Sequence, residues 1–194
     1  MTLMVARRYE EAETLVREWI AEAGDDLPET MKRRFDFQLG MIAIIRGDLP
    51  RARDLLISAI NDDEVLAYSG DAVMVVTLAA LASEQLGDTE TAEEMLSDAE
   101  RKIRRARLNG VDDPGIYYNE AILLTMQSQP ERAMQKLNEA YQRGFREQWV
   151  MDIDGRLAPL RSHPEFLALM EQIRNEVDQA RTEIETLSQV LAQL

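Results

Sequence analysis

Apolar residues recur along the chain at the three- and four-residue spacing of amphipathic helices, and short polar turns separate the runs. Over residues 33–62 this pattern predicts two helices joined by a turn at Arg46, Gly47 and Asp48. The apolar face of the first is Phe35, Leu39, Ile42 and Ile45, and that of the second is Ala52, Leu55, Leu56, Ala59 and Ile60. One such pair cannot bury both faces, so it needs neighbours of the same kind.

The same pattern returns about every forty residues, which indicates an internal repeat. Four second helices open on Ala12, Ala52, Ala92 and Ala133, with Val16, Leu56, Leu96 and Leu137 four residues later. Three residues beyond these come Trp19, Ala59, Ala99 and Ala140, and the preceding turns carry Arg7, Gly47, Gly87 and Ser128. Small residues at fixed positions let neighbouring helices approach closely, and glycine suits a tight turn.

These hairpins resemble tetratricopeptide repeats. The residues that carry the resemblance are Leu39, Gly40, Gly47, Asp48, Leu49, Ala52, Leu56 and Ala59 in one copy, Gly87, Asp88, Ala92, Leu96 and Ala99 in the next, and Tyr117, Ala121, Ala133, Leu137 and Ala140 in the third. The family repeat is about 34 residues long, so the longer period here implies lengthened helices or loops. The resemblance implies an all-α fold, a right-handed α-solenoid of stacked helical hairpins.

We expect residues 1–162 to form this solenoid and residues 163–194 to form a long C-terminal helix. The solenoid divides into a half repeat at 1–24, hairpins at 29–62, 71–108 and 114–143, and a capping segment at 144–162. Because the half repeat lacks a first helix, we expect the chain to be a fragment of a longer protein; a short capping helix at a natural N-terminus is the alternative. The capping segment resembles the one that follows such repeats in bacterial class III adenylate cyclases and winged-helix transcriptional activators.

The C-terminal helix carries a heptad pattern over about four heptads. Its apolar residues alternate at spacings of four and three: Phe166, Met170, Ile173, Val177, Ala180, Ile184, Leu187, Leu191 and Leu194. Branched residues at a and leucine at d favour a parallel two-stranded coiled coil, in which Glu176 could pair with Arg181 of a partner. The pattern predicts a homodimer, and the alternative is that the helix docks on its own solenoid.

The resemblance also implies a partner-binding groove lined by the first helices of the hairpins. The corresponding residues here are Arg34, Phe37, Met41, Ile44, Met74, Thr77, Leu81, Gln85, Tyr118, Ile122 and Met126. Such an apolar groove, with adaptable methionines, suits a helix or peptide partner. The alternative is that these residues pack between long helices or beneath the C-terminal helix.

Composition and charge narrow the function classes. The net charge of −14 argues against direct nucleic-acid binding, and the absence of cysteine excludes disulfides and thiolate metal sites while allowing a cytoplasmic location. No apolar run approaches the roughly 20 residues that span a bilayer. The basic run 101–107 is typical of a solvated helix end, the lone His163 of a cap or loop, and Asp152–Gly155 of a turn rather than a calcium loop.

The sequence contains no phosphate-binding loop, dinucleotide fingerprint or nucleophile elbow, so we expect no enzyme activity, metal or cofactor. We expect a non-catalytic module for protein–protein interaction and self-association, the regulatory part of a larger bacterial signalling or transcription protein. A sensor that encloses a small molecule or short peptide in the groove is the alternative.

Overall fold

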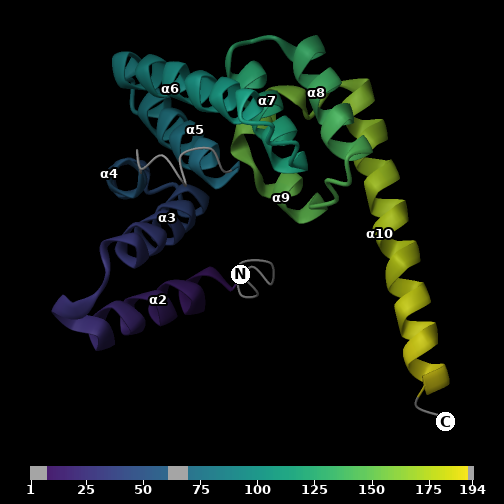
Figure 1. Ribbon diagram of the computed structural model, residues 1–194, viewed down its shortest axis with the longest axis horizontal. Coiled ribbons are helices and arrows are strands. Elements are labelled where there is room, and N and C mark those ends of the chain that lie inside the picture. The colour runs from purple at the N-terminus through teal and green to yellow at the C-terminus, as the bar shows by residue number, and fades with distance from the viewer. Residues whose placement is uncertain (1–7, 61–69, 192–194) are drawn as a thin grey trace.

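The computed structural model describes residues 8–60 and 70–191, and all regular elements within these ranges are helical (Figure 1). The α-helices are α2 (Tyr9–Ala23), α3 (Glu29–Arg46), α4 (Leu49–Ala59), α5 (Gly70–Gln85), α6 (Thr89–Leu108), α7 (Pro114–Met126), α8 (Pro130–Gln142), α9 (Gln148–Ile153) and α10 (Pro164–Leu191). Two short 3-10 helices, η1 (Gly24–Asp26) and η2 (Gly155–Leu160), complete the set. The predicted all-α class is confirmed for the described residues.

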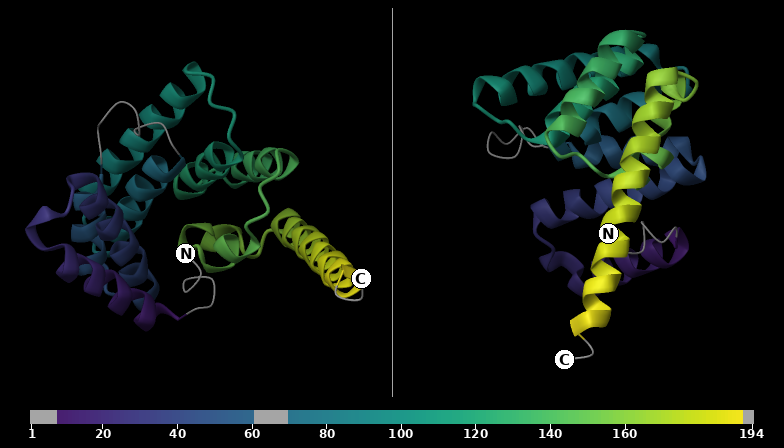
Figure 2. Two further views of the ribbon diagram at one scale, coloured as in Figure 1. Left: turned by 60° about the horizontal axis from the view of Figure 1, so that its bottom comes forward. Right: turned by 90° about the vertical axis from the view of Figure 1, so that its right-hand side faces the viewer.

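Helices that follow one another in sequence pack in pairs: α3 with α4, α5 with α6, and α7 with α8. Because α5 also packs against α4 and α7, the pairs form one continuous row (Figures 1 and 2). The pairs begin and end within a few residues of the hairpins expected from the sequence. Arg7, residues 61 and 62, and Leu194 lie outside the described residues.

The turns between paired helices share one geometry. Gly47 and Gly87 have φ angles of 74° and 80°, and Ser128 adopts the same left-handed conformation with φ of 59°. In each turn the next residue donates its amide to a carbonyl five positions back, as from Asp48 to Ala43 and from Gln129 to Leu124. This is the hydrogen bond of a Schellman C-cap, which accounts for glycine in this column.

The aligned small residues are buried at the helix contacts. Ala52 and Ala133 are fully buried, as is Ala99, and a Cβ added at Gly40 would lie 2.8 Å from Leu56 Cγ. This close approach explains why α3 carries a glycine opposite α4. The Trp19 column departs from the pattern, because Trp19 is 47% exposed.

The apolar interior continues along the row as adjoining clusters. At the C-terminal end one cluster joins α7, α8, α9, η2 and the first half of α10 through Ile122, Leu137, Met151, Leu157, Leu160, Phe166 and Ile173. Helix α10 then runs past the rest of the molecule along its outer edge (Figures 1 and 2). The capping segment and the start of α10 therefore belong to the core, whereas the end of α10 does not.

Candidate protein-binding surfaces

The residues predicted to line the groove fall into two groups in the structure. Thr77, Leu81, Tyr118 and Ile122 are buried; Phe37, Met41, Ile44, Met74 and Met126 are half-buried; Arg34 and Gln85 are exposed. We call the surface of α3, α5 and α7 that carries them the inner face. Part of it is thus open to solvent, and part is covered by the chain itself.

The capping segment covers the buried part. Its η2 helix packs against α7, and a Cβ added at Gly155 would lie 3.7 Å from Leu81 Cδ2 on α5. The left view of Figure 2 shows α9 on the inner side of the curved row of helices. At these positions the residues of the predicted groove pack within the molecule, and the capping segment takes part in covering them.

A buried ion pair anchors the capping segment to the inner face. Arg156 Nη2 lies 2.6 Å from Asp154 Oδ2, and Arg156 Nε lies 2.8 Å from Asp154 Oδ1. Arg156 Nη1 donates to Thr77 Oγ1 and, at 3.4 Å, to the carbonyl of Met74, both on α5. The Tyr118 hydroxyl donates to Asp154 Oδ2 at 2.7 Å from α7. One charged pair therefore joins η2, α5 and α7.

The pair stays ionised despite its burial. Desolvation raises the pKa of the Asp154 carboxyl, but the charge of Arg156 and hydrogen bonds from Arg156 and Tyr118 outweigh it and lower that pKa overall. Burial, reinforced by the negative charge of Asp154, raises the pKa of Tyr118 well above its ordinary value, so its hydroxyl keeps its proton. Both side chains of the ion pair are nearly fully buried, so loss of one would leave an uncompensated charge in the interior.

Sequence reasoning treated Asp154 only as part of a turn. Asp154 does cap η2, accepting from the Arg156 amide at 3.0 Å. The sequence did not predict the ion pair of Asp154 with Arg156, or the hydrogen bonds from Arg156 to α5. The available signal was two opposite charges separated by one glycine between the apolar residues Ile153 and Leu157.

The seam of α10 is used by the chain itself over its first half. Phe166, Leu169, Met170 and Ile173 are buried in the core cluster, and Val177 packs against it half-buried. We call residues 164–177 the docked half. The structure thus places Phe166, Met170, Ile173 and Val177, expected at a self-association interface, against α8 and α9 of their own chain.

A polar clamp marks the end of the docked half. Glu176 accepts a hydrogen bond from the Tyr141 hydroxyl. It also forms an ion pair with Arg146, whose Nε lies 2.7 Å from Glu176 Oε2. The Tyr141 hydrogen bond, together with Arg146, lowers the pKa of Glu176 although desolvation opposes this. Glu176, which the heptad pattern would pair with Arg181 of a second copy, is thus engaged within its own chain, and Arg181 Nη1 lies 3.4 Å from Asp178 Oδ1.

Residues 178–191 form the projecting half of α10. All side chains from Asp178 to Gln189 are exposed, among them Ala180 of the seam. Ile184 and Leu187 are each 63% exposed, although they continue the seam that is buried about three turns earlier at Ile173. The side chain of Leu191 lies outside the described residues.

The basic run 101–107 is engaged with carboxylates of its own chain. Arg101 and Lys102 pair with Asp98 at 3.0 and 3.4 Å, Arg104 pairs with Glu100, and Arg107 pairs with Glu120 of α7. These contacts fit the interpretation of a charged helix surface. They do not indicate an anion site.

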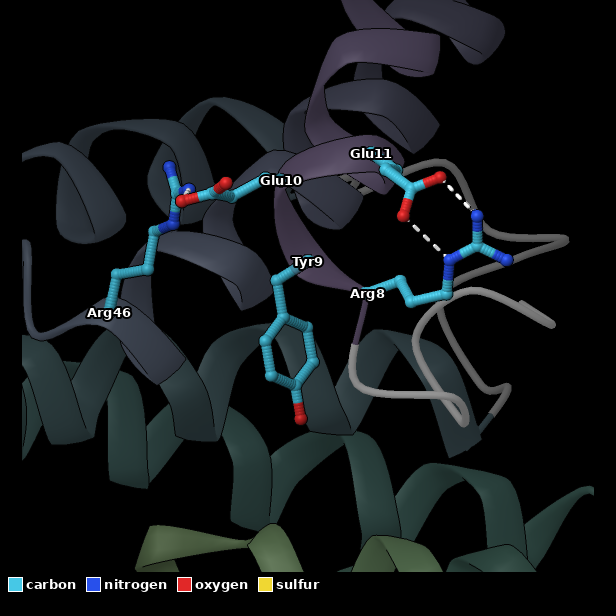
Figure 3. A pocket seen from close by; sticks show the side chains of 5 residues that line it. All are labelled: Arg8, Tyr9, Glu10, Glu11 and Arg46. Carbon is cyan, nitrogen blue, oxygen red and sulfur yellow. Dashed lines mark hydrogen bonds and ion pairs between the residues drawn. The ribbon is translucent and has the colours of Figure 1, made fainter.

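The start of α2 holds a shallow hollow of about 350 Å³, lined by Arg8, Tyr9, Glu10, Glu11 and Arg46 (Figure 3). Glu10 pairs with Arg46 and Glu11 with Arg8, one pair on either side of the Tyr9 ring. Nearby, the buried Glu13 pairs with Arg17, Arg46 and Arg51, and the Arg51 hydrogen bond lowers its pKa most. Each of these carboxylates has an arginine partner, and the pairs of Arg46 and Arg51 join α2 to α3 and α4.

Residues 8–60 and 70–191 contain no group of three or more acidic or histidine side chains that could hold a metal ion. Over the same ranges, no helix is both long and apolar enough to cross a membrane. Comparison with known protein families, with curated proteins and with solved structures finds no match to this chain.

Proposed function

We propose that this protein is a non-catalytic helical-repeat module that binds a partner protein and self-associates through the projecting half of α10. The proposal includes the tetratricopeptide-like, right-handed stacking of the hairpins. Three observations support it: the consecutive helix pairs, their row-like packing, and the shared turn geometry at Gly47, Gly87 and Ser128.

The exposed seam of α10 carries the proposal. Ile184 and Leu187 are each 63% exposed on a helix whose other residues from Asp178 to Gln189 are also exposed. Fully burying an aliphatic side chain of this size contributes about 1.5–3 kcal/mol, so association has a clear driving force. The docked half holds the helix in place, which removes the nucleation cost that makes short isolated helices marginal. A second helix can therefore pair with a helix that is already formed.

The open part of the inner face is the second binding surface. Phe37, Met41 and Ile44 form a half-buried stripe on α3, and Met74 of α5 lies half-buried beside the same core cluster. Apolar side chains at this spacing, with two methionines, suit the apolar face of a partner helix. A sensor that encloses a small molecule has less support, because its ligand would have to displace the capping segment from Thr77, Leu81 and Tyr118.

The broader setting is proposed from the resemblance alone. The closing segment after the hairpins resembles that of bacterial cyclases and winged-helix regulators, so we propose a regulatory role within a larger cytoplasmic signalling or transcription protein. In that setting self-association would bring two copies of a linked domain together.

The test is the solution mass by light scattering of the whole chain and of a chain ending at Asp178. A cut at Asp178 keeps the docked half, whereas a cut near Ser162 would remove Phe166 and Ile173 from the core. We expect a dimer for the whole chain and a monomer for the shortened one.

Point variants give a matched control for the truncation. Ile184→Glu with Leu187→Glu should yield a monomer, since each places a charge on the exposed seam. Leu167→Glu should leave the dimer intact, because Leu167 is 55% exposed on α10 but lies outside the seam. A monomeric whole chain at concentrations near 100 micromolar, on the order of a weak dimer's dissociation constant, would refute self-association.

A further inference from the structure

The docked and projecting halves of α10 share one seam on one side of the helix. Phe166, Met170, Ile173 and Val177 lie on that seam against α8 and α9, and Ala180, Ile184 and Leu187 continue it. A straight helix drifts by only about 20° per heptad relative to a heptad pattern. The projecting seam therefore faces the same side of α10 as the side that α8 and α9 occupy further back.

This placement decides how a second copy can approach. In a parallel pair, the second α10 would lie along the whole seam of the first. Its residues 164–177 would then need the space that α8 and α9 already fill around Ile173 and Val177. In an antiparallel pair, the docked half of the second α10 lies beyond the paired segment. The helical rows of the two copies therefore lie at opposite ends of that segment.

We propose that two copies of this chain pair through their projecting halves in an antiparallel orientation. This rests on the self-association proposed above and replaces the parallel orientation expected from the heptad pattern. The seam itself favours the same arrangement. Antiparallel pairing sets Ile184 opposite Leu187 of the second copy, and the small Ala180 opposite position 191. Parallel pairing would set Ala180 opposite Ala180 of the second copy, and two such small side chains would leave the interface poorly packed at that level.

The charges of the projecting half point in the same direction. Residues 178–185 contain three carboxylates, Asp178, Glu183 and Glu185, and one guanidinium, Arg181, for a net charge of −2. Residues 186–191 contain no charged side chain. Parallel pairing would set the two acidic stretches side by side, whereas antiparallel pairing sets each against an uncharged stretch. Opposed helix dipoles add to this preference.

The orientation can be measured with single spin labels, because the chain has no cysteine of its own. Gln179→Cys and Thr186→Cys place labels at exposed positions one heptad apart and outside the seam. With Ile184 opposite Leu187, the twofold axis lies between residues 185 and 186. At a rise of about 1.5 Å per residue, two labels at 179 are separated by about 20 Å along the helix, and two at 186 by about 2 Å.

Pulsed electron paramagnetic resonance should therefore give a clearly longer label-to-label distance for Gln179→Cys than for Thr186→Cys. In a third variant, Ala180→Cys, oxidation should give little disulfide-linked dimer, since the two thiols lie far apart. Equal distances at 179 and 186, with ready cross-linking at 180, would show a parallel dimer and overturn the orientation while leaving self-association intact. Light scattering on the same labelled samples separates the failures, because a monomer would overturn both.

Discussion

The docked and projecting halves of α10 carry the same heptad pattern in opposite environments. Ile173 is 1% exposed, whereas Ile184, which lies on the same seam, is 63% exposed. The docked half meets α8 and α9, whereas the projecting half extends beyond them (Figure 1). A heptad pattern thus indicates that a helix has an apolar seam. The length of the neighbouring helices determines how much of that seam is covered by the same chain.

The two halves also differ in how their polar residues are used. In the docked half, Glu176 is held by Tyr141 and Arg146, which come from α8 and the loop that follows it. In the projecting half, Arg181 pairs with Asp178 of its own helix. Exposed pairs of this second kind contribute little, so the projecting half depends on its anchored neighbour for its helical structure.

The largest expected effect comes from breaking the buried ion pair of Arg156 and Asp154, which holds the capping segment beneath the docked half. Arg156→Met leaves Asp154 buried without its partner, and breaking such a pair costs about 3–5 kcal/mol. Because Leu157 and Leu160 of η2 share a cluster with Phe166 and Ile173, the docked half should loosen as well. Urea unfolding gives the loss of stability.

A double variant checks the cause of this loss. Adding Asp154→Leu to Arg156→Met removes the stranded carboxylate and should recover a large part of the lost stability. If Arg156→Met alone unfolds at the urea concentration of the parent chain, the pair does not hold the capping segment to α5 and α7.

The next effect compares equal truncations in the two halves. Ile173→Ala should lower the free energy of unfolding by about 2–5 kcal/mol, because it leaves a cavity in the core. Ile184→Ala should change it by less than about 0.5 kcal/mol in the monomer, as exposed sites do. Both variants are measured in a Leu187→Glu background, which keeps the chain monomeric. Similar losses for the two would contradict the division of α10.

A smaller effect concerns the clamp at the boundary. The pKa of Glu176 is lowered in the folded chain, chiefly by the Tyr141 hydrogen bond. The clamp therefore stabilises the fold above the ordinary glutamate pKa, about 4.3, and this contribution is lost as the pH falls through the lower folded value.

Glu176→Gln should reduce this pH dependence, and Arg146→Met should reduce it in part, when stability is followed between about pH 6 and pH 3. Glu183→Gln on the projecting half is the matched control and should leave the profile unchanged. An unchanged profile for Glu176→Gln would show that the clamp does not hold the boundary.

The smallest effect is a gain. Ser128 has a φ of 59° in the turn between α7 and α8, where the equivalent turns carry Gly47 and Gly87. Ser128→Gly should stabilise the chain by roughly 0.5 kcal/mol, because glycine adopts this conformation without a Cβ penalty. Thermal unfolding measures it, and a loss of stability would show that the greater freedom of glycine in the unfolded chain prevails.

Local signals account for how much of this fold could be predicted. The bounds of α3 to α8 follow from apolar spacing and from turns at Gly47, Gly87 and Ser128, all of which act within a few residues. The return of the capping segment onto the inner face does not follow from such signals. It depends on contacts such as that of Arg156 with Thr77, which are 79 residues apart in sequence.

The candidate site shows the same limit. The stripe at Phe37, Met41 and Ile44 was predicted from the resemblance to tetratricopeptide repeats, and it is half-buried in the structure. Tyr118 and Ile122 have the same spacing on α7, yet η2 covers them, and no local pattern distinguishes the two stripes. The seam of α10 was predicted as a single surface, but its division after Val177 depends on where α8 and α9 end.

Hydrogen exchange along α10 at two protein concentrations tests the division of this helix most directly. We expect amides of residues 166–177 to exchange slowly at both concentrations, because they belong to the core. Amides of residues 178–191 should exchange rapidly in dilute solution and slowly in concentrated solution, where a second copy covers them. Slow exchange of both halves that is independent of concentration would contradict the account, as would a docked half that exchanges as rapidly as the projecting half.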